Sequence, residues 1–134
     1  MNQTSAHQRT VMVVEDFDDT RQLLRLLLER QGYYVLEANN GRSAVELAKS
    51  AHPRLILMDL SLPVLDGLSA TRQIREQGFL NDVLIVAVTA HQEREYKEKA
   101  LAAGCDDFVN KPLDFDRLEA LLRRFMPVHR EHSE

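Results

Sequence analysis

The sequence predicts an α/β protein: a doubly wound, five-stranded parallel sheet with five helices on its two faces, forming three α/β/α layers. Short apolar runs alternate five times with segments that have helical spacing of their apolar residues. Two of these runs, at Leu55–Met58 and Val83–Val88, contain no polar residue, which is typical of strands buried on both faces of a parallel sheet. Short connections and right-handed crossovers then place helices on both faces.

Length and composition indicate one cytoplasmic domain. The 134 residues can bury a sizeable core, and the net charge of −4 argues against a nucleic-acid binder. No apolar segment has the length of a membrane span, and the polar start lacks the core of a signal peptide. The single cysteine, Cys105, excludes an internal disulfide and fits a reducing compartment. We expect a flexible N-terminus over residues 1–9, the domain over 10–126 and a flexible tail over 127–134.

The first strand is expected at Thr10–Val14, a short run rich in β-branched residues. Asp18 or Asp19 would cap the following helix, Thr20–Gln31. The apolar face of this helix would consist of four leucines at helical spacing: Leu23, Leu24, Leu27 and Leu28. Leu26 falls beside this face, so it is either exposed or part of a wide buried face.

The middle of the chain contains two further strand and helix pairs. A strand at Tyr33–Ala38 is followed by turn residues and a helix from about Arg42 to Ser50. The central strand, Leu55–Asp59, ends on a single carboxylate. A helix is then expected between Asp66 and Gly78, since the two residues are typical of a helix start and a helix end.

The last third repeats the alternation. The run Val83–Val88 predicts the fourth strand, and Asp107–Asn110 predicts a short fifth strand. Between them, the charged helix His91–Ala103 keeps three residues for the core: Tyr96, Ala100 and Leu101. Asp114 is expected to cap the final helix. Its apolar residues recur at helical spacing: Leu118, Leu121, Leu122 and Phe125.

Polar residues follow four of these strands, and parallel strands end at one edge, where open α/β sheets bind ligands. They are Glu15 with Asp16, then Asp59, Thr89 and Lys111. Three neighbouring carboxylates repel one another unless a divalent cation such as Mg²⁺, or Mn²⁺, neutralises them. Lys111 and Thr89 suit phosphoryl oxygens, and an aspartate can be the nucleophile of phosphoryl transfer. These residues predict Mg²⁺-assisted phosphorylation of Asp59.

Four sequence blocks resemble the receiver domain of response regulators, the phosphoacceptor switches of two-component and phosphorelay signalling. They are Val13–Asp16, Leu57–Gly67, Val88–Ala90 and Val109–Pro112. Each block alone is weakly specific, but the four in this order are highly specific. The resemblance extends from about Thr10 to Met126 and implies the flavodoxin-like strand order 2-1-3-4-5.

The resemblance implies a role for each matching residue of the acidic group. Asp59 corresponds to the phosphoacceptor. Asp16 corresponds to a direct metal ligand, and Glu15 to the acid that holds the metal through water. The backbone carbonyl of Ser61 would be a further ligand. Glu15 stands where many receivers have aspartate, a common variation that should preserve metal binding.

A second set of residues would contact the phosphoryl group and transmit the change. Thr89 corresponds to the switch hydroxyl, Lys111 to the lysine that pairs with the phosphoryl group, and the backbone N–H of Ala90 to a further donor. The bond from Lys111 to Pro112 is typically cis in this family. Phe108 occupies the position of the aromatic switch residue, often tyrosine, so rotamer exchange would occur without a hydroxyl group.

The resemblance also implies partners. A sensor histidine kinase or a histidine-containing phosphotransfer protein would donate the phosphoryl group, with Leu26 as a contact if it is exposed. A downstream protein would bind the last two helices and the final strand; nucleic acid and membranes are not expected partners. We expect no enzyme activity beyond self-catalysed phosphoryl transfer and autodephosphorylation. The chain would be a stand-alone receiver, or one cut from a larger protein such as a hybrid kinase.

Three other functions were weighed. A phosphohydrolase of the haloacid dehalogenase type also uses an aspartate nucleophile, but Ser61 stands where those enzymes have a second acid. A flavin-binding module of the same fold would need a hydroxyl- and glycine-rich phosphate loop, whereas the first strand here is followed by acids. A degenerate receiver that serves only as a scaffold finds no support, because all key positions are occupied.

Overall fold

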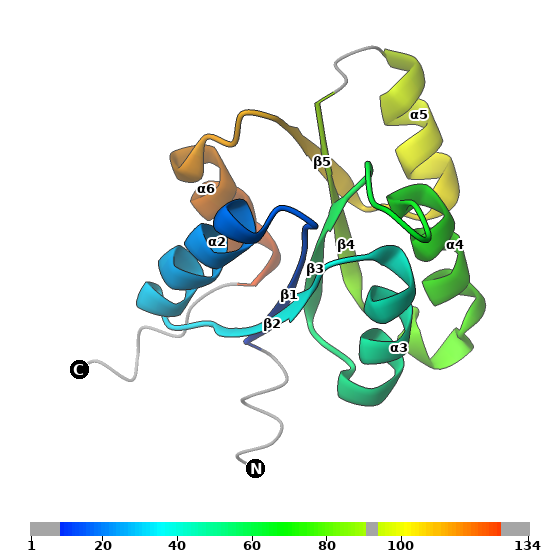
Figure 1. The fold of residues 1–134 in the computed structure, drawn as a ribbon, viewed down its shortest axis with the longest axis horizontal. Coiled ribbons are helices and arrows are strands. Elements are labelled where there is room, and N and C mark those ends of the chain that lie inside the picture. The colour runs from blue at the N-terminus through cyan, green and yellow to red at the C-terminus, as the bar shows by residue number, and fades with distance from the viewer. Residues whose placement is uncertain (1–8, 91–93, 127–134) are drawn as a thin grey trace.

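A computed structural model describes residues 9–90 and 94–126 of the chain. Its centre is a sheet of five parallel strands in the order β2-β1-β3-β4-β5 (Figure 1). The strands are β1 (Thr10–Val14), β2 (Tyr34–Ala38), β3 (Leu55–Asp59), β4 (Leu84–Thr89) and β5 (Asp107–Asn110). The predicted strand order and the predicted parallel sheet are therefore confirmed.

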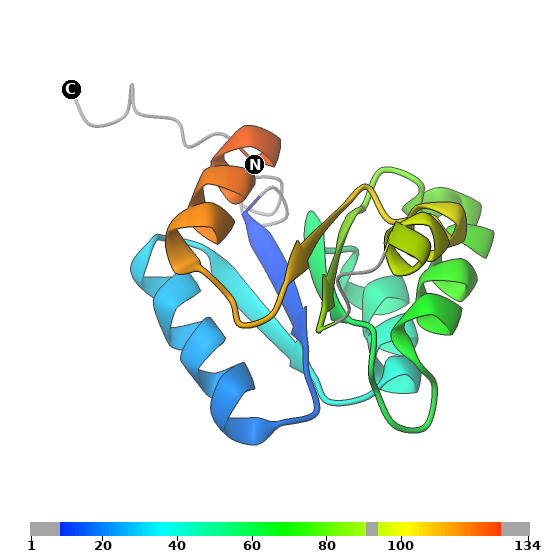
Figure 2. The same cartoon turned by 90° about the horizontal axis from the view of Figure 1, so that it is seen from above.

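Helices cover both faces of the sheet. Those in the described ranges are α2 (Asp18–Arg30), α3 (Gly41–Ala51), α4 (Gly67–Glu76), α5 (Arg94–Ala103) and α6 (Phe115–Phe125), with a short 3₁₀ helix, η1 (Gly78–Leu80). The views in Figures 1 and 2 show α2 and α6 on one face and α3, α4 and α5 on the other. This three-layer arrangement confirms the predicted fold class.

The core consists of two apolar layers, one on each side of the sheet. Along β3, Leu55 and Leu57 belong to the layer beneath α2 and α6, whereas Ile56 and Met58 belong to the layer beneath α3 and α4. Successive side chains of a strand point to opposite faces, so a strand in the middle of the sheet must be apolar at every position. The two layers fix β3, and thereby its last residue, Asp59, in the middle of the sheet.

Two predicted helix caps can be judged. Asp114 caps α6 by accepting the N–H groups of Asp116 and Arg117, as expected. The prediction that Asp18 or Asp19 caps α2 is wrong. The helix already begins at Asp18, so the residue at the N-cap is Phe17, whose side chain makes no capping hydrogen bond.

Two leucines predicted for the core are exposed. Leu23 is 49% exposed because α2 is covered along a narrow face centred on Leu24 and Leu28. Leu101 is 52% exposed because α5 buries its alanines at 100 and 103 instead. Leu26 is 51% exposed, which decides between the two alternatives for this residue.

Cys105 is buried, in agreement with a packing role. The predicted start of the α5 helix at His91 lies outside the described residues, as do the two predicted flexible ends, apart from Arg9. None of the helices within residues 9–90 and 94–126 combines the length and the apolar character that a membrane crossing needs.

Candidate functional site

Three carboxylates meet at the carboxyl edge of the sheet. Strands β1 and β3 are parallel neighbours with Val14 opposite Met58, so the residues that follow these two are brought together. One oxygen from each of Glu15, Asp16 and Asp59 lies within 4.8 Å of the others. Glu15 and Asp59 are buried, with exposed fractions of 5% and 3%, whereas Asp16 is open to solvent. The predicted acidic group is thus assembled from two strand ends.

Both carboxylate oxygens of Asp59 have a donor. Its Oδ2 accepts a hydrogen bond from the ammonium group of Lys111, with Nζ at 2.9 Å, and its Oδ1 accepts the backbone N–H of Ser61 at 2.9 Å. Lys111 also lies 3.6 Å from Oε1 of Glu15. The ammonium group therefore forms ion pairs with both buried acids of the cluster.

The surroundings shift the protonation of two of these groups. Burial raises the pKa of Glu15, the Phe17 N–H lowers it, and the negative charge of Asp59 raises it; the net pKa lies above its ordinary value. For Lys111, burial lowers the pKa, but the hydrogen bond to Asp59 and the charges of both acids outweigh burial and raise it. Lys111 is therefore a cation at neutral pH, and Glu15 binds a proton more readily than an exposed glutamate does.

Thr89 is the last residue of the neighbouring strand, β4, and Ala90 follows it. Thr89 is buried, its carbonyl accepts the Lys111 N–H at 2.8 Å, and Val88 pairs with Asp59 in the sheet. The end of β4 consequently lies beside the end of β3, and the lysine is fixed to it through the main chain. The bond from Lys111 to Pro112 is cis, as predicted.

The loop from β3 to α4 passes close to Asp59. A Cβ atom at Gly67, the first residue of α4, would lie 2.3 Å from the carbonyl oxygen of Asp59, so only glycine fits there. Val64 in the same loop adopts a left-handed conformation, with φ 69°, and is 72% exposed. A β-branched residue in this conformation is strained. The helix start at Gly67 was predicted, but its contact with Asp59 was not.

Phe108 lies on β5 and is half-buried against the core layer beneath α3 and α4. The ammonium group of Lys97, on α5, lies 4.7 Å from the centroid of its ring. A cation at this distance from a ring is attracted to its face. The ring thus packs against the core and contacts the α5 helix.

One residue of this region was not predicted. Arg21 on α2 donates a hydrogen bond to the backbone carbonyl of Glu15 at 2.9 Å. A charged residue on a helix usually lies in solvent, and the acid that anchors this one, Glu37, is distant in sequence. The only signal for Arg21 in the sequence was its spacing of three residues from Asp18.

The donor set fits a hard divalent cation. Three carboxylates face the single ammonium group of Lys111, so the cluster carries an excess of negative charge. Oxygen atoms alone are offered, which favours Mg²⁺ or Mn²⁺ over metals that prefer nitrogen and sulfur. The exposed side of the cluster, at Asp16, leaves access for water and for a ligand.

The fold and this site define a doubly wound α/β protein with a buried, lysine-paired aspartate at the carboxyl edge of its sheet. Residues 11–123 match the family described as response regulator receiver domain. The chain belongs to that family, which functions in two-component signalling.

Individual relatives agree with this assignment. The polar-differentiation response regulator DivK of Brucella ovis is 32% identical over 118 residues, which are 88% of this chain and 96% of the relative. The receiver domain of the Pseudomonas aeruginosa sensor histidine kinase PA1611, solved with a magnesium ion in its active site cleft, is 36% identical with a TM-score of 0.82. The two chains are covered to 90% and 98%.

A third relative was solved with its partner. It is the receiver domain of the Saccharomyces cerevisiae response regulator Ssk1, in complex with the histidine phosphotransfer protein Ypd1. It is 34% identical with a TM-score of 0.83, and the match covers 87% of this chain and 88% of the other.

Proposed function

We propose that the protein is a phosphoacceptor switch: Asp59 accepts a phosphoryl group from a phosphohistidine, and the modified domain changes its affinity for a protein partner. The observation that carries this proposal is the environment of Asp59. Its side chain is 4% exposed, paired with Lys111 at 2.9 Å, and grouped with two further acids. A simple structural ion pair would not need the additional carboxylates.

Asp59 is the nucleophile in this proposal. Its carboxylate oxygen attacks the phosphorus of the donor phosphohistidine in line with the leaving imidazole. The P–N bond breaks as a P–O bond forms, and the imidazole nitrogen keeps the electron pair and takes up a proton from water. Lys111 neutralises charge on the phosphoryl oxygens, since electrostatic stabilisation is the main task in such transfers.

The residues that would hold Mg²⁺ or Mn²⁺ are Asp16 and Asp59 directly, Ser61 through its backbone carbonyl, and Glu15 through water. When bound, the metal supplies positive charge that stabilises the transferring phosphoryl group. The PA1611 receiver, with its magnesium ion, supports this assignment by similarity.

Thr89 and Phe108 would transmit the change. Phosphorylation adds a charge of about −1.5 to −2 and strong acceptor oxygens. The Thr89 hydroxyl and the Ala90 N–H would donate to these oxygens, which draws the end of β4 toward Asp59. The ring of Phe108 could then move inward and leave Lys97. This movement would alter the surface formed by α5, β5 and α6, where the downstream partner binds.

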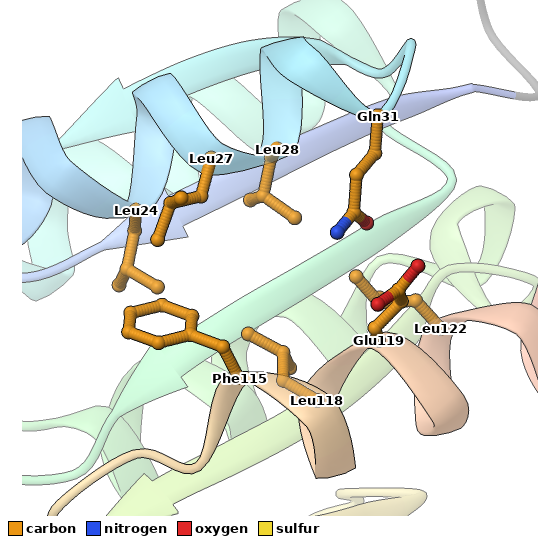
Figure 3. Close-up of a pocket in the computed structure, with 8 residues that line it drawn as sticks. All are labelled: Leu24, Leu27, Leu28, Gln31, Phe115, Leu118, Glu119 and Leu122. Atoms are coloured by element: carbon orange, nitrogen blue, oxygen red, sulfur yellow. The ribbon is translucent and has the colours of Figure 1, made fainter.

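The donor would bind on the other side of the site, along α2. Leu24, Leu27 and Leu28 of this helix line an apolar groove between α2 and α6. The exposed Leu23 is next to this row on the helix surface, and the exposed Leu26 lies farther round the helix, away from the groove. Figure 3 shows Leu24, Leu27 and Leu28 of α2 facing Phe115 and Leu118 of α6 across this groove. The complex of the Ssk1 receiver with Ypd1 supports a histidine phosphotransfer protein, or a kinase with a similar histidine-bearing helix, as the donor.

The test uses beryllofluoride, a tight-binding mimic of the aspartyl phosphoryl group, added with Mg²⁺ and followed by amide NMR spectra. We expect shifts at Asp59, Thr89, Ala90 and Lys111, together with shifts along α5 and β5. Asp59→Ala, which lacks the acceptor, should show none of them. Spectra of the wild type that do not change would contradict the phosphoacceptor function.

A further inference from the structure

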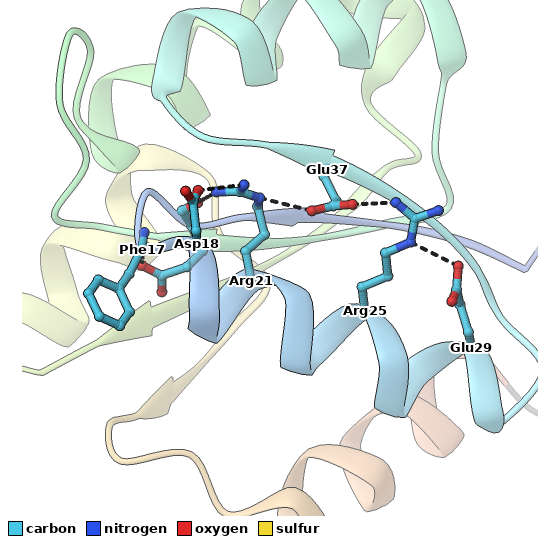
Figure 4. Close-up of polar contacts among 7 residues, drawn as sticks. Phe17, Asp18, Arg21, Arg25, Glu29 and Glu37 are labelled. Atoms are coloured by element: carbon cyan, nitrogen blue, oxygen red, sulfur yellow. Dashed lines mark hydrogen bonds and ion pairs between the residues drawn. The ribbon is translucent and has the colours of Figure 1, made fainter.

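Arg21 connects the acidic site to the two elements that flank it. It lies in the first turn of α2, and its side chain is only 12% exposed. Figure 4 shows its guanidinium group between Asp18 and Glu37, with Arg25 on the far side of Glu37. Such burial is unusual for an arginine on a surface helix, unless its charge and its N–H groups have partners.

Three hydrogen bonds hold this guanidinium group. Nη1 donates to the backbone carbonyl of Glu15 at 2.9 Å, Nε donates to Oε1 of Glu37 at 2.9 Å, and Nη2 donates to Oδ1 of Asp18 at 2.7 Å. The partners belong to the segment after β1, to β2 and to the start of α2. The rigid fork of an arginine can satisfy three such acceptors at once, whereas a lysine offers only one ammonium group.

The contact with Glu15 is made to the main chain of the metal-binding segment. Glu15 comes directly after β1, and its N–H donates to the Ala38 carbonyl on β2 at 3.0 Å. Its carbonyl accepts from Arg21. The peptide groups on both sides of Glu15 are therefore fixed, one by the sheet and one by the guanidinium group. The same segment carries Asp16.

Glu37, which accepts a hydrogen bond from Arg21, is itself a stable anion. The hydrogen bond from Arg25 lowers the pKa of Glu37, burial raises it, and the hydrogen bond from Arg21 lowers it, with a net pKa below the ordinary value. Arg25 also pairs with Glu29, one turn along the helix. Glu37 thus keeps its charge at neutral pH and holds Arg21 from the direction of the sheet.

We infer that Arg21 is a positioning residue of the phosphoacceptor site, which fixes the main chain of Glu15 and Asp16 in the geometry that binds the metal. The inference rests on the proposed function. Residues that hydrogen-bond to the ligands of a metal orient those ligands. Replacing such a residue typically weakens metal affinity by about 10- to 100-fold. Arg21 acts on the backbone rather than on a side chain of a ligand, so we expect an effect near the lower end of this range.

Arg25 provides a matched control. It is another arginine of α2 and pairs with the same Glu37, but its hydrogen bonds go to Glu37 and Glu29, not to Glu15 or Asp16. Methionine keeps the length and the apolar stem of either arginine without the charge. The experiment compares Mg²⁺ dissociation constants, from isothermal titration calorimetry, for the wild type, Arg21→Met and Arg25→Met. Circular dichroism and thermal unfolding check that each variant is folded.

The inference predicts that Arg21→Met weakens Mg²⁺ binding by about tenfold. The Arg25→Met variant should stay within about twofold of the wild type, because an exposed ion pair contributes little. In amide spectra recorded without metal, Arg21→Met should shift the signals of Asp16 and Phe17, and Arg25→Met should not. Arg21→Lys should restore the affinity only in part, and it replaces Arg21→Met in the comparison if the methionine variant does not fold.

Three results would overturn the inference. If the folded Arg21→Met variant bound Mg²⁺ with unchanged affinity, Arg21 would only stabilise the fold and would not position the metal site. The proposed function would then still stand. Equal weakening in both arginine variants would show that the effect passes through Glu37 and not through the Glu15 carbonyl. If the wild type itself bound no Mg²⁺, the metal-dependent function would fail together with the inference.

Discussion

The ammonium group of Lys111 lies 2.9 Å from Oδ2 of Asp59 and joins the end of β5 to the end of β3 across β4. The Asp59 side chain is 4% exposed, and that of Lys111 is 32% exposed. The pair is thus buried on the side of the carboxylate and open on the side of the ammonium group. This arrangement leaves the lysine free to follow the charge from the carboxylate to a phosphoryl group.

The stability of the metal-free protein should depend on both members of this pair. Lys111→Met leaves two buried acids without their cation. We expect it to lower the free energy of unfolding by about 2 kcal/mol, less than the 3–5 kcal/mol of a fully buried pair because solvent reaches the lysine. The double variant Asp59→Asn/Lys111→Met should recover part of the loss, since only Glu15 is then left without the cation. Strictly additive losses in urea denaturation would contradict the coupling.

The pH dependence of stability should carry the signature of Glu15. Its pKa is raised in the folded protein above the ordinary value of 4.5, so the folded state binds more protons than the unfolded state in the window above pH 4.5. Stability from this residue is therefore full below that window and is lost as pH rises through the folded pKa. Glu15→Gln should remove this loss.

The measurement is urea denaturation at several pH values without metal. The difference in unfolding free energy between Glu15→Gln and the wild type should change in favour of the variant as pH rises above 4.5, and then level off. A difference that stays constant with pH would show that Glu15 has an ordinary pKa. Glu98→Gln, at an exposed glutamate of α5, serves as a control for the general effect of removing a carboxylate.

Replacement of Val64 should stabilise the protein. A left-handed conformation costs about 1–3 kcal/mol for a residue of this type, and glycine adopts it freely. Glycine also makes the unfolded chain more flexible, which offsets about 0.4–1 kcal/mol. We expect Val64→Gly to gain about 1 kcal/mol net in thermal or urea unfolding. Val64→Ala keeps the strain and is the control; an equal gain in both variants would exclude backbone strain as the cause.

Leu26 tests the donor surface. With an exposed fraction of 51%, it contributes little to the core, so Leu26→Ala should leave stability and the reaction with acetyl phosphate nearly unchanged. Transfer from a phosphohistidine protein should slow by about five- to tenfold, as expected for the loss of more than 1 kcal/mol at an interface. Leu101→Ala, at a similarly exposed leucine on α5, is the matched control. Equal slowing with both donors would instead indicate a structural role.

Sequence patterns were sufficient for the sheet and for the acidic group. Runs such as Leu55–Met58 have no polar residue, so their strand character is unambiguous, and parallel strands necessarily end at one edge. This reasoning placed Asp59 and Lys111 at the same edge of the sheet, and the family resemblance added the strand order. The ion pair joins residues that are 52 positions apart in the sequence. They come together because their strands lie in the same sheet.

Sequence patterns were insufficient where the outcome depends on how far a neighbouring element extends. Helical periodicity gives the direction of the apolar face but not its width, so Leu23 and Leu101 were wrongly placed in the core. The role of Arg21 was invisible for a different reason. Its partners Glu15 and Glu37 are a main-chain carbonyl and a side chain from another strand, and no local pattern connects them.

The most direct test of the central claim is the intact mass of the protein after incubation with acetyl phosphate and Mg²⁺. We predict one phosphoryl adduct on the wild type, none on Asp59→Ala, and none on the wild type when EDTA removes the metal. Because fast hydrolysis could remove the adduct, the samples are quenched in acid at short intervals. An adduct that persists in Asp59→Ala, or a wild type that acquires none at any time and also fails to bind beryllofluoride, would contradict the assignment of Asp59 as the phosphoacceptor.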